Sequence, residues 1–502
     1  MSQTPPITDT SRAAQAGSGG LLPDAGGALG PTRALARFVV QGRPADLPPA
    51  VVHQATRCLV DWLGVALGGQ QDRSLDILLD YARLVGGARQ ASVVGRAFRT
   101  SAPLAALLNG HASHVLDFDD TFASAETTLH GTPPVYSAAL AVGEWQRASG
   151  AEVLNAFVLG FEVAARVALA LGPAHYDAGW HVTGTAGRFG AAAAAGKLLD
   201  LSETQLARAF GIVGTQAGGL KAVYGTMGKP YHAARAAHDG VAAALVARAG
   251  FTAAEDILEA RYGLLDLYTR QAYPERLALP DPPRYAVLDD GFKPYPCGSL
   301  IHATIDAALD ALGGARVEPQ AVERVEAWVN PYTATVTAKP DPTTGLEAKF
   351  SAQHCVAVAL AHGRGVTLAD FTDAAATDPT LRALRARVRL HAVPDCPKDA
   401  ARLAIHLRDG RTLTADVPHA RGTVERPLDD AGLDAKFLAL ATPVLGERRA
   451  RRVLARARAF ATAPDAGALL RATRPAPVRQ ARSGSVAEEM EPASRPVRHG
   501  DR

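Results

Sequence analysis

Cysteines are few in this sequence, and they lie far apart. The 502 residues include four, and no two of them form a C-x-x-C pair: Cys58, Cys297, Cys355 and Cys396. A zinc ribbon or a cysteine-ligated cluster needs thiols at close spacing. The sequence therefore gives no support to either kind of metal site, and we expect reduced thiols in a cytoplasmic protein.

Segments that would direct the chain to or through a membrane are also missing. Residues 1–30 are rich in Gly, Ala, Ser and Pro and have no apolar segment behind a basic start. No apolar run free of charged residues reaches the length of roughly 18 that a membrane-spanning helix needs. We therefore predict neither export nor a membrane span.

Neither sign of charge is in excess. Lys and Arg total 53 against 50 Asp and Glu, a formal net charge of +3, so no strong cationic field predicts binding to nucleic acid or to an anionic membrane. Lysine itself is scarce, since only eight of the 53 basic residues are lysines: Lys197, Lys221, Lys229, Lys293, Lys339, Lys349, Lys398 and Lys436. An ammonium is compact and has a tunable pKa, whereas a guanidinium stays protonated. The positions that keep lysine are therefore candidates for specific chemistry.

Length and composition predict two domains. A hydrophobic content of 47% in 502 residues is enough for two cores. We predict a mostly α-helical protein, with a large all-helical domain formed by residues 31–290 and 426–464 and a smaller α+β lid domain formed by residues 291–425. Residues 1–30 and 465–502 lack apolar periodicity and are predicted to be disordered tails.

Amphipathic periodicity marks the helices of the first region. Residues 48–69 begin with two prolines, carry apolar residues along one stripe and end at two glycines. Ser202 and Gln205 have the spacing of a capping box, which predicts another helix start. Strands do not alternate with helices here, so a doubly wound sheet is not expected.

The pattern changes near residue 290. Apolar periodicity predicts helices and β-branched residues predict strands in this order: a helix at 302–312, a strand at 321–330, a helix at 350–363, a strand at 385–393 and a hairpin at 401–417. The hairpin is expected to turn at Asp409-Gly410, because this dipeptide tolerates the positive φ of a tight turn.

Residues 109–134 combine imidazoles with carboxylates. His111, His114 and Asp117 follow one another at i, i+3 and i+6. Thr121 lies four residues beyond Asp117, so a single helix would project these side chains from one side. Acids beside imidazoles shift pKa values, which suits proton transfer. The alternative is a capping acidic turn with ordinary surface histidines.

A glycine-rich segment follows at residues 179–199. Gly184, Gly187 and Gly190 recur every three residues, and close packing of helices explains them better than phosphate binding does, because no P-loop pattern follows. His181 precedes the predicted helix, where the positive end of the helix dipole would lower an imidazole pKa or help to bind an anion. A structural hydrogen-bonding histidine is the alternative.

Two further segments join lysine to histidine. Lys229, His232 and Arg235 are spaced at three and would give a cationic face that holds carboxylates, or simply a solvated basic helix start. Lys293 and His302 flank a rigid, proline-containing loop at the predicted domain junction, where pockets are common.

Taken together, these segments resemble a known family. They contain, in order, LDFDDT followed by a histidine, HxTGTxG, GTMxKPxHAxRAA and KPYPCxxxxH. Over about residues 35–460 this series resembles the MmgE/PrpD family, which includes 2-methylcitrate dehydratases, cis-aconitate decarboxylases and an iminodisuccinate epimerase. The resemblance implies a helical domain with an α+β lid, an active site in the cleft between them and a homodimer. It also implies a small di- or tricarboxylate substrate and no metal or organic cofactor.

The resemblance further implies which residues form the site. The implied catalytic residues are Asp117, His130, His181, Lys229 and Lys293. The two lysines would bind carboxylates and stabilise developing negative charge, while His130 would transfer a proton at carbon. His181, with Asp117 and Thr121, would orient the substrate or a leaving hydroxyl. The predicted substrate-binding residues are Thr121, His232, Arg235 and His302.

The expected activity is that of a cofactor-independent lyase, in first place a 2-methylcitrate dehydratase-like hydro-lyase. A decarboxylase and an isomerase or epimerase are alternatives on the same scaffold, and an inactive carboxylate-binding or scaffold paralogue is an alternative of another class. Three positions around the predicted pocket depart from the family pattern: Gly131, Ala234 and Gly298. These departures allow a substrate other than 2-methylcitrate.

Overall fold

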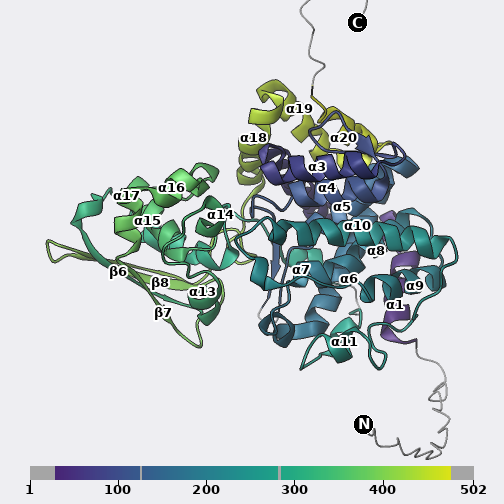
Figure 1. The fold of residues 1–502 in the computed structure, drawn as a ribbon, viewed down its shortest axis with the longest axis horizontal. Helices are drawn as coiled ribbons and strands as arrows, with labels where there is room; N and C mark the ends of the chain where they lie inside the picture. The colour runs from purple at the N-terminus through teal and green to yellow at the C-terminus, as the bar shows by residue number, and fades with distance from the viewer. Residues whose placement is uncertain (1–28, 125–126, 281–283, 476–502) are drawn as a thin grey trace, which may run out of the picture.

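Two hydrophobic cores organise the chain. The computed structural model describes residues 29–124, 127–280 and 284–475. The larger core gathers buried side chains from residues 35–292 and 433–470, and the smaller core takes its side chains from residues 295–420. Figure 1 shows the two units side by side, with the sheet-containing unit on the left. The predicted fold class, a large helical domain with a smaller α+β domain, is confirmed.

The larger unit consists mainly of helices. They are α1 (Pro31–Gln41), α2 (Pro49–Gly68), α3 (Arg73–Val85), α4 (Ala102–Ala112), α5 (Thr132–Gln146), α6 (Gly150–Asp177), α7 (Val182–Thr185), α8 (Gly187–Leu198), α9 (Glu203–Gly214), α10 (Gly228–Arg248), α11 (Leu264–Leu267), α18 (Asp430–Leu445), α19 (Glu447–Arg458) and α20 (Gly467–Ala472). The predicted capping box is confirmed at the start of α9, where Ser202 and Gln205 exchange side-chain to backbone hydrogen bonds.

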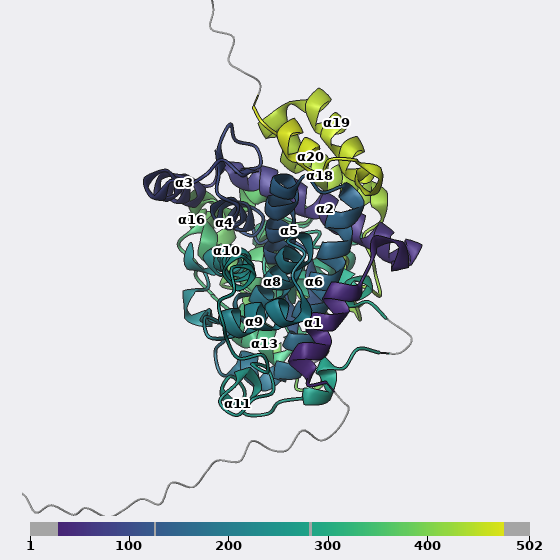
Figure 2. The same ribbon diagram turned by 90° about the vertical axis from the view of Figure 1, so that its right-hand side faces the viewer.

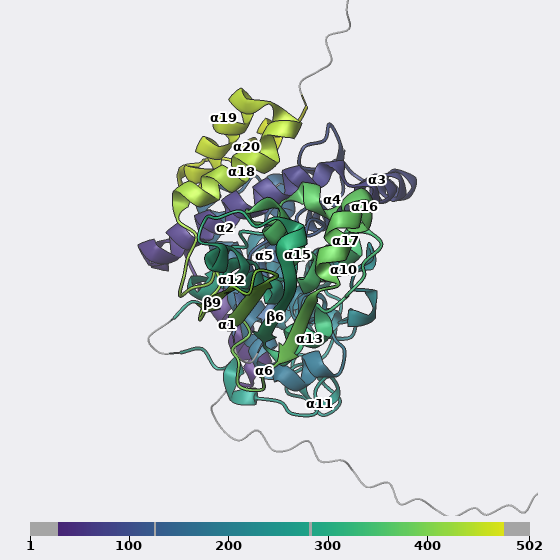
Figure 3. The ribbon, with the colours of Figure 1, turned by 90° about the vertical axis from the view of Figure 1, so that its left-hand side faces the viewer.

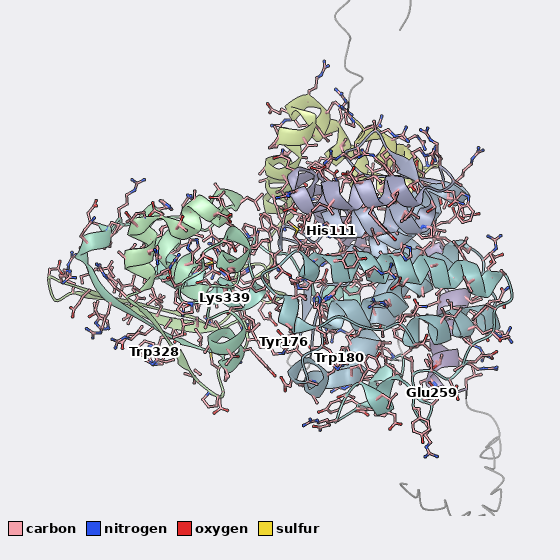
Figure 4. The ribbon with its side chains drawn as sticks, viewed as in Figure 1. His111, Tyr176, Trp180, Glu259, Trp328 and Lys339 are labelled. Carbon is pink, nitrogen blue, oxygen red and sulfur yellow. The ribbon has the colours of Figure 1, made fainter. Side chains whose placement is uncertain are left out.

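Helix α6 runs through the middle of this unit. It is long and apolar enough to cross a membrane by composition, but 89% of its apolar stretch is buried inside the protein. Gly172 has a φ of +64° and precedes Pro173, so the helix kinks near its C-terminal end. The kink carries the last turn, which includes Tyr176, towards the boundary between the two units (Figure 4).

Small residues let α6 and α8 approach closely. A Cβ atom at Gly190 would lie 2.6 Å from the carbonyl oxygen of Gly160, and one at Gly184 would lie 2.5 Å from that of Gly218. No real Cβ tolerates such distances. The interpretation as a helix-packing residue is therefore confirmed for Gly190, whereas Gly184 packs against the loop that follows α9.

The smaller unit packs helices on a four-stranded sheet. The strands, in the order β7-β6-β8-β9 across the sheet, are β7 (Val388–Ala392), β6 (Val322–Val329), β8 (Ala401–Leu407) and β9 (Thr412–Val417). The helices are α12 (His302–Leu312), α13 (Pro331–Val336), α14 (Gly345–Ala348), α15 (Ala352–His362), α16 (Asp373–Thr377) and α17 (Pro379–Arg385). Only the β6–β7 pair is parallel within this sheet. The predicted hairpin is confirmed, with Gly410 at a φ of +89° in its turn. Figure 3 views this unit in front of the helical one.

Short strands complete the helical unit. They are β1 (Ala91–Ser92), β2 (Arg99–Thr100), β3 (Thr121–Ala123), β4 (Thr128–Leu129) and β5 (Asp290–Gly291). β3 pairs with β4 on one side and with β5 on the other. The β3–β5 pairing brings the acidic segment next to the loop that leads into the smaller unit.

The C-terminal helices return to the helical unit, and Figure 2 shows α18–α20 gathered beside α2. The predicted tail at 465–502 begins too early, because α20 lies inside that range. Leu469 and Leu470 of α20 are buried in the larger core, which explains why this short segment is ordered. The remainder of that tail, and residues 1–28 of the other one, lie outside the described residues.

Candidate active site

The segment that carries the predicted acids and imidazoles is not one helix. Helix α4 ends one residue after His111, and turns follow until β3 begins at Thr121. Asp117 has a φ of +53°, in the left-handed region, and so redirects the chain. His111 points into the helical unit, where its Nε2 lies 2.6 Å from Ser74 Oγ (Figure 4). The expectation of a single helix face extending to Thr121 is therefore wrong.

Asp117 holds two lysines from distant parts of the chain. Its Oδ1 accepts hydrogen bonds from Lys293 Nζ at 2.6 Å and from Lys229 Nζ at 2.9 Å. Lys293 Nζ also donates to the Asp117 carbonyl oxygen at 3.1 Å. Lys229 belongs to the first turn of α10, and Lys293 lies in the loop after β5. Three predicted catalytic residues thus meet at one buried carboxylate.

The charges of this cluster support one another. Burial disfavours the charge on Asp117, but the two ammonium groups outweigh it and hold the pKa of that carboxyl well below its usual range. Burial likewise opposes the charge on Lys293, and yet Asp117 raises the pKa of that lysine above its ordinary value. One carboxylate and two ammonium groups leave an excess positive charge, which favours an anionic ligand.

Lys349 was not predicted as a site residue, yet it lies directly behind this cluster. Its Nζ donates to the carbonyl oxygens of Leu116 at 2.6 Å and Pro296 at 2.9 Å. The lysine follows α14 of the smaller unit, so it fastens that unit to the loop that carries Asp117. Burial lowers the pKa of Lys349 to about 8. The scarcity of lysine is the signal in the sequence that points to it.

His130 is held in a defined tautomer. Its Nδ1 lies 3.0 Å from Asp119 Oδ2 and 3.0 Å from the Asp120 carbonyl oxygen. Both partners only accept, so Nδ1 carries a proton, and Nε2 is the ring nitrogen left to exchange a proton with a ligand. Asp119 Oδ2 also lies 2.9 Å from His114 Nδ1. A carboxylate that orients an imidazole in this way is the arrangement of a general acid–base group.

Asp119 remains charged because of these contacts. Burial opposes its charge, but His114 and His130 outweigh that effect and hold the pKa of the Asp119 carboxyl well below its usual range. Burial lowers the pKa of His114 to about 4. The carboxylate can therefore balance a positive charge that His130 gains when it accepts a proton.

His181 and His232 form a neutral imidazole pair. Their Nδ1 atoms lie 3.0 Å apart, so one ring donates and the other accepts. Burial, with Lys229 nearby, holds the pKa of His181 well below its ordinary value, and burial lowers that of His232 to about 4. His181 lines the cavity described next, whereas His232 lies behind it and contacts His181.

A cavity between the two units collects these groups. All five predicted catalytic residues line it: Asp117, His130, His181, Lys229 and Lys293. The smaller unit contributes further residues, among them Ser299, Tyr332, Phe350 and Lys398. Figure 4 shows Tyr176, another lining residue, at the boundary of the units. The site is thus a cleft between domains, with the imidazoles and the Asp117 cluster on the helical side and Lys398 on the other.

The other predicted substrate-binding residues lie outside this cavity. Thr121 Oγ1 is 3.3 Å from His130 Nδ1, and the threonine lines a second, adjoining cavity. His302 lines the same adjoining cavity, with Nε2 3.3 Å from the Cys297 carbonyl oxygen. Arg235 lines neither cavity and pairs with Asp239 at 2.7 Å, because α10 turns its side chain away.

Two buried groups within the described residues have the atoms that a metal ion would need. His114, Asp119 and His130 form one, and Cys58, Asp120 and Asp290 form the other; in each the potential ligand atoms lie within 4.8 Å of one another. In the first group both imidazoles already direct Nδ1 at Asp119 Oδ2, so hydrogen bonds account for its geometry.

Comparisons with known proteins agree with this layout. The MmgE/PrpD N-terminal domain matches residues 33–277, and the MmgE/PrpD C-terminal domain matches residues 295–460. The chain is 29% identical to the cis-aconitate decarboxylase of Homo sapiens over 415 residues, 80% of this chain and 85% of the relative. It is 25% identical to the cis-aconitate decarboxylase of Aspergillus terreus over 440 residues, 81% of this chain and 88% of the relative.

Proposed function

The chain belongs to the MmgE/PrpD family, and from this premise we propose that it is a lyase that removes carbon dioxide from a small tricarboxylate of the cis-aconitate type. The single observation that carries the proposal is the Asp117 carboxylate, bonded to Lys229 and Lys293 in a cavity that His130 also lines. The cis-aconitate decarboxylases among its relatives favour decarboxylation over the dehydration expected first.

The lysines provide donors for carboxylates. An ammonium group has three N–H donors. Lys293 directs two of its hydrogen bonds to Asp117, and Lys229 directs one. The remaining donors are available to substrate oxygens, and the excess positive charge of the cluster stabilises the negative charge that develops on the carbon skeleton.

Loss of carbon dioxide also needs a proton. The bond to one carboxyl carbon breaks, its electron pair stays on the carbon skeleton, and a proton is added there. His130 is suited to deliver that proton from Nε2, because Asp119 fixes the ring through Nδ1 and balances the charge of the protonated ring. His181, a neutral imidazole on the same cavity, orients the substrate.

Dehydration of 2-methylcitrate is the second candidate. Removal of water needs one group to take a proton from carbon and another to protonate the leaving hydroxyl. The cavity has two imidazoles, on His130 and His181, which supports such a division of roles. The homodimer, the cytoplasmic location and the independence from cofactors belong to the same proposal and rest on the sequence and the family.

The two reactions differ in what they release. Purified protein is incubated with cis-aconitate and, separately, with 2-methylcitrate, and carbon dioxide and the organic products are measured. We expect carbon dioxide from cis-aconitate, and deuterium at carbon in the product when the solvent is deuterium oxide. His130→Gln should retain the melting temperature and lose this turnover.

Other results would favour the alternatives. Water loss from 2-methylcitrate without carbon dioxide from cis-aconitate would support the hydro-lyase. Deuterium exchange without loss of water or carbon dioxide would support an isomerase or epimerase. A rise in melting temperature with these acids but no turnover of any would indicate an inactive carboxylate-binding protein.

A further inference from the structure

Lys398 lies where the two cavities meet. It follows β7 and precedes β8 in the smaller unit. It lines both the inner cavity, which contains the proposed catalytic groups, and the adjoining outer one. Asp117 and Lys229 line only the inner cavity. Lys398 is therefore a cation of the site whose position differs from that of the Asp117 cluster.

The contacts of Lys398 include groups on both sides of the cleft. Its Nζ donates to the Ser124 carbonyl oxygen, in the segment after β3 of the helical unit, at 3.2 Å. It also lies 5.5 Å from the centre of the Tyr332 ring. The Tyr332 hydroxyl in turn donates to Asp177 Oδ1 at 2.7 Å, at the end of α6. These contacts place the ammonium group on the wall of the cleft.

The charges that line the inner cavity are distributed over two places. The first place is the Asp117 cluster, where one carboxylate and two ammonium groups sum to one positive charge. The second place is the ammonium group of Lys398. A dicarboxylate whose two carboxylates lie next to each other can be satisfied by the first place alone. A tricarboxylate has a third carboxylate farther along its carbon chain, and an anion there favours a second cation.

We propose that Lys398 binds one carboxylate of a tricarboxylate substrate, namely the carboxylate farthest from the reacting carbon. Lys398 would thereby select tricarboxylates over dicarboxylates. This inference rests on the proposed function of the cavity. It gives the smaller unit a role in substrate recognition, while the acid–base groups come from the helical unit.

Binding of two unreactive acids tests the proposal. Propane-1,2,3-tricarboxylate has all three carboxylates, and propane-1,2-dicarboxylate lacks one terminal carboxylate. Dissociation constants are measured by calorimetry for the wild type, Lys398→Met and Lys398→Arg. We expect Lys398→Met to weaken binding of the tricarboxylate by about 10-fold or more, the effect of losing a charge-assisted hydrogen bond, and to change that of the dicarboxylate by less than about twofold. Lys398→Arg should recover most of the tricarboxylate affinity.

Lys339→Met is the matched control. Lys339 belongs to the same unit, its Nζ lies 4.0 Å from Glu347, and it lines neither cavity. The variant should bind both acids as the wild type does. Equal weakening of both acids by Lys398→Met, unchanged affinity for both, or a wild type that binds the dicarboxylate as tightly as the tricarboxylate would overturn the proposal. Turnover of cis-aconitate is measured separately, so its absence beside the expected binding pattern would refute the decarboxylation and leave the Lys398 subsite standing.

Discussion

Asp117 and Asp120 lie three residues apart in one loop, and both are buried, yet their surroundings are opposite. Asp117 faces the cavity and contacts two ammonium groups. Asp120 faces the interior of the helical unit, where the acids Asp290 and Asp61 are its neighbours. The left-handed backbone of Asp117 turns the loop between them, which separates the two side chains.

The protonation states follow from these neighbours. The pKa of Asp117 is held well below its usual range, because the two lysines outweigh burial. Burial, with Asp290 and Asp61 nearby, raises the pKa of Asp120 well above its usual range, and burial raises that of Asp290 to about 7. Burial alone therefore does not decide the charge of a carboxyl group; the groups packed against it do.

Asp117→Asn should have the largest effect on stability and activity, because it removes the one carboxylate that the two lysines share. Lys229 and Lys293 would then lie buried without an anion, and breaking a buried pair costs about 3–5 kcal/mol. We expect a strong loss of stability in urea unfolding and loss of measurable turnover. Added propane-1,2,3-tricarboxylate should restore part of the stability by supplying carboxylates to the lysines. Wild-type stability in the variant would show that the lysines do not depend on Asp117.

Asp119→Asn extends the comparison to the carboxylate between the two. The amide keeps the shape but removes the charge that balances protonated His130. We expect a fall of about 10²–10⁴-fold in kcat with a small change in melting temperature, as for other imidazoles that lose an orienting carboxylate. Asp120→Asn, at the neighbouring position, is the matched control and should keep most of the activity. Equal losses in both variants would mean that the loop, not the charge, matters.

Lys229→Arg and Lys293→Arg ask whether positive charge alone is enough on the Asp117 side. A guanidinium keeps the charge but is planar and larger than an ammonium. Because both lysines are buried against one carboxylate oxygen, we expect folding to persist and kcat/KM to fall, by about 10–100-fold for a displaced substrate contact. Full activity in both variants would show that these two positions need only a positive charge, which arginine supplies as well as lysine.

Much of the fold could be predicted from the sequence, and so could the set of residues that come together at the site. Local signals explain this: the capping box at Ser202 and the Asp409-Gly410 turn act over a few residues, and the structure has both. The four motifs also predicted that Asp117, Lys229 and Lys293 belong together, since a family resemblance carries long-range information that periodicity does not.

Other features depended on tertiary contacts that no local pattern reveals. The spacing of His111 and Asp117 is helical, but the helix ends between them, so the two side chains diverge. Lys349 and Lys398 reach the cleft from the smaller unit, and their partners lie 233 and 274 residues away in the sequence. Only the scarcity of lysine pointed to them.

Asp120→Asn should have the smallest effect on activity and the most informative dependence on pH. A carboxyl group whose pKa is raised by folding keeps a proton that the unfolded chain has already lost, so the folded state binds more protons and its stability falls as pH rises. For Asp290, with an ordinary pKa of 3.8 and a folded value of about 7, this fall spans roughly pH 4 to 7. For Asp120 it begins at the same ordinary pKa and continues up to the raised pKa of the folded state. An amide at position 120 removes a carboxyl group whose pKa is raised well above its usual range, so the fall should become shallower. The melting temperatures of the wild type and of Asp120→Asn should then be similar at pH 5, and that of the variant should be higher at pH 8.

Asp117 contributes to the pH dependence of stability with the opposite sign. Its stabilisation is present above the ordinary carboxyl range and is lost only as pH falls below that range. A variant of Asp120 that loses stability equally at both pH values would show that this carboxyl is charged in the folded protein, and the contrast between the two aspartates would fail.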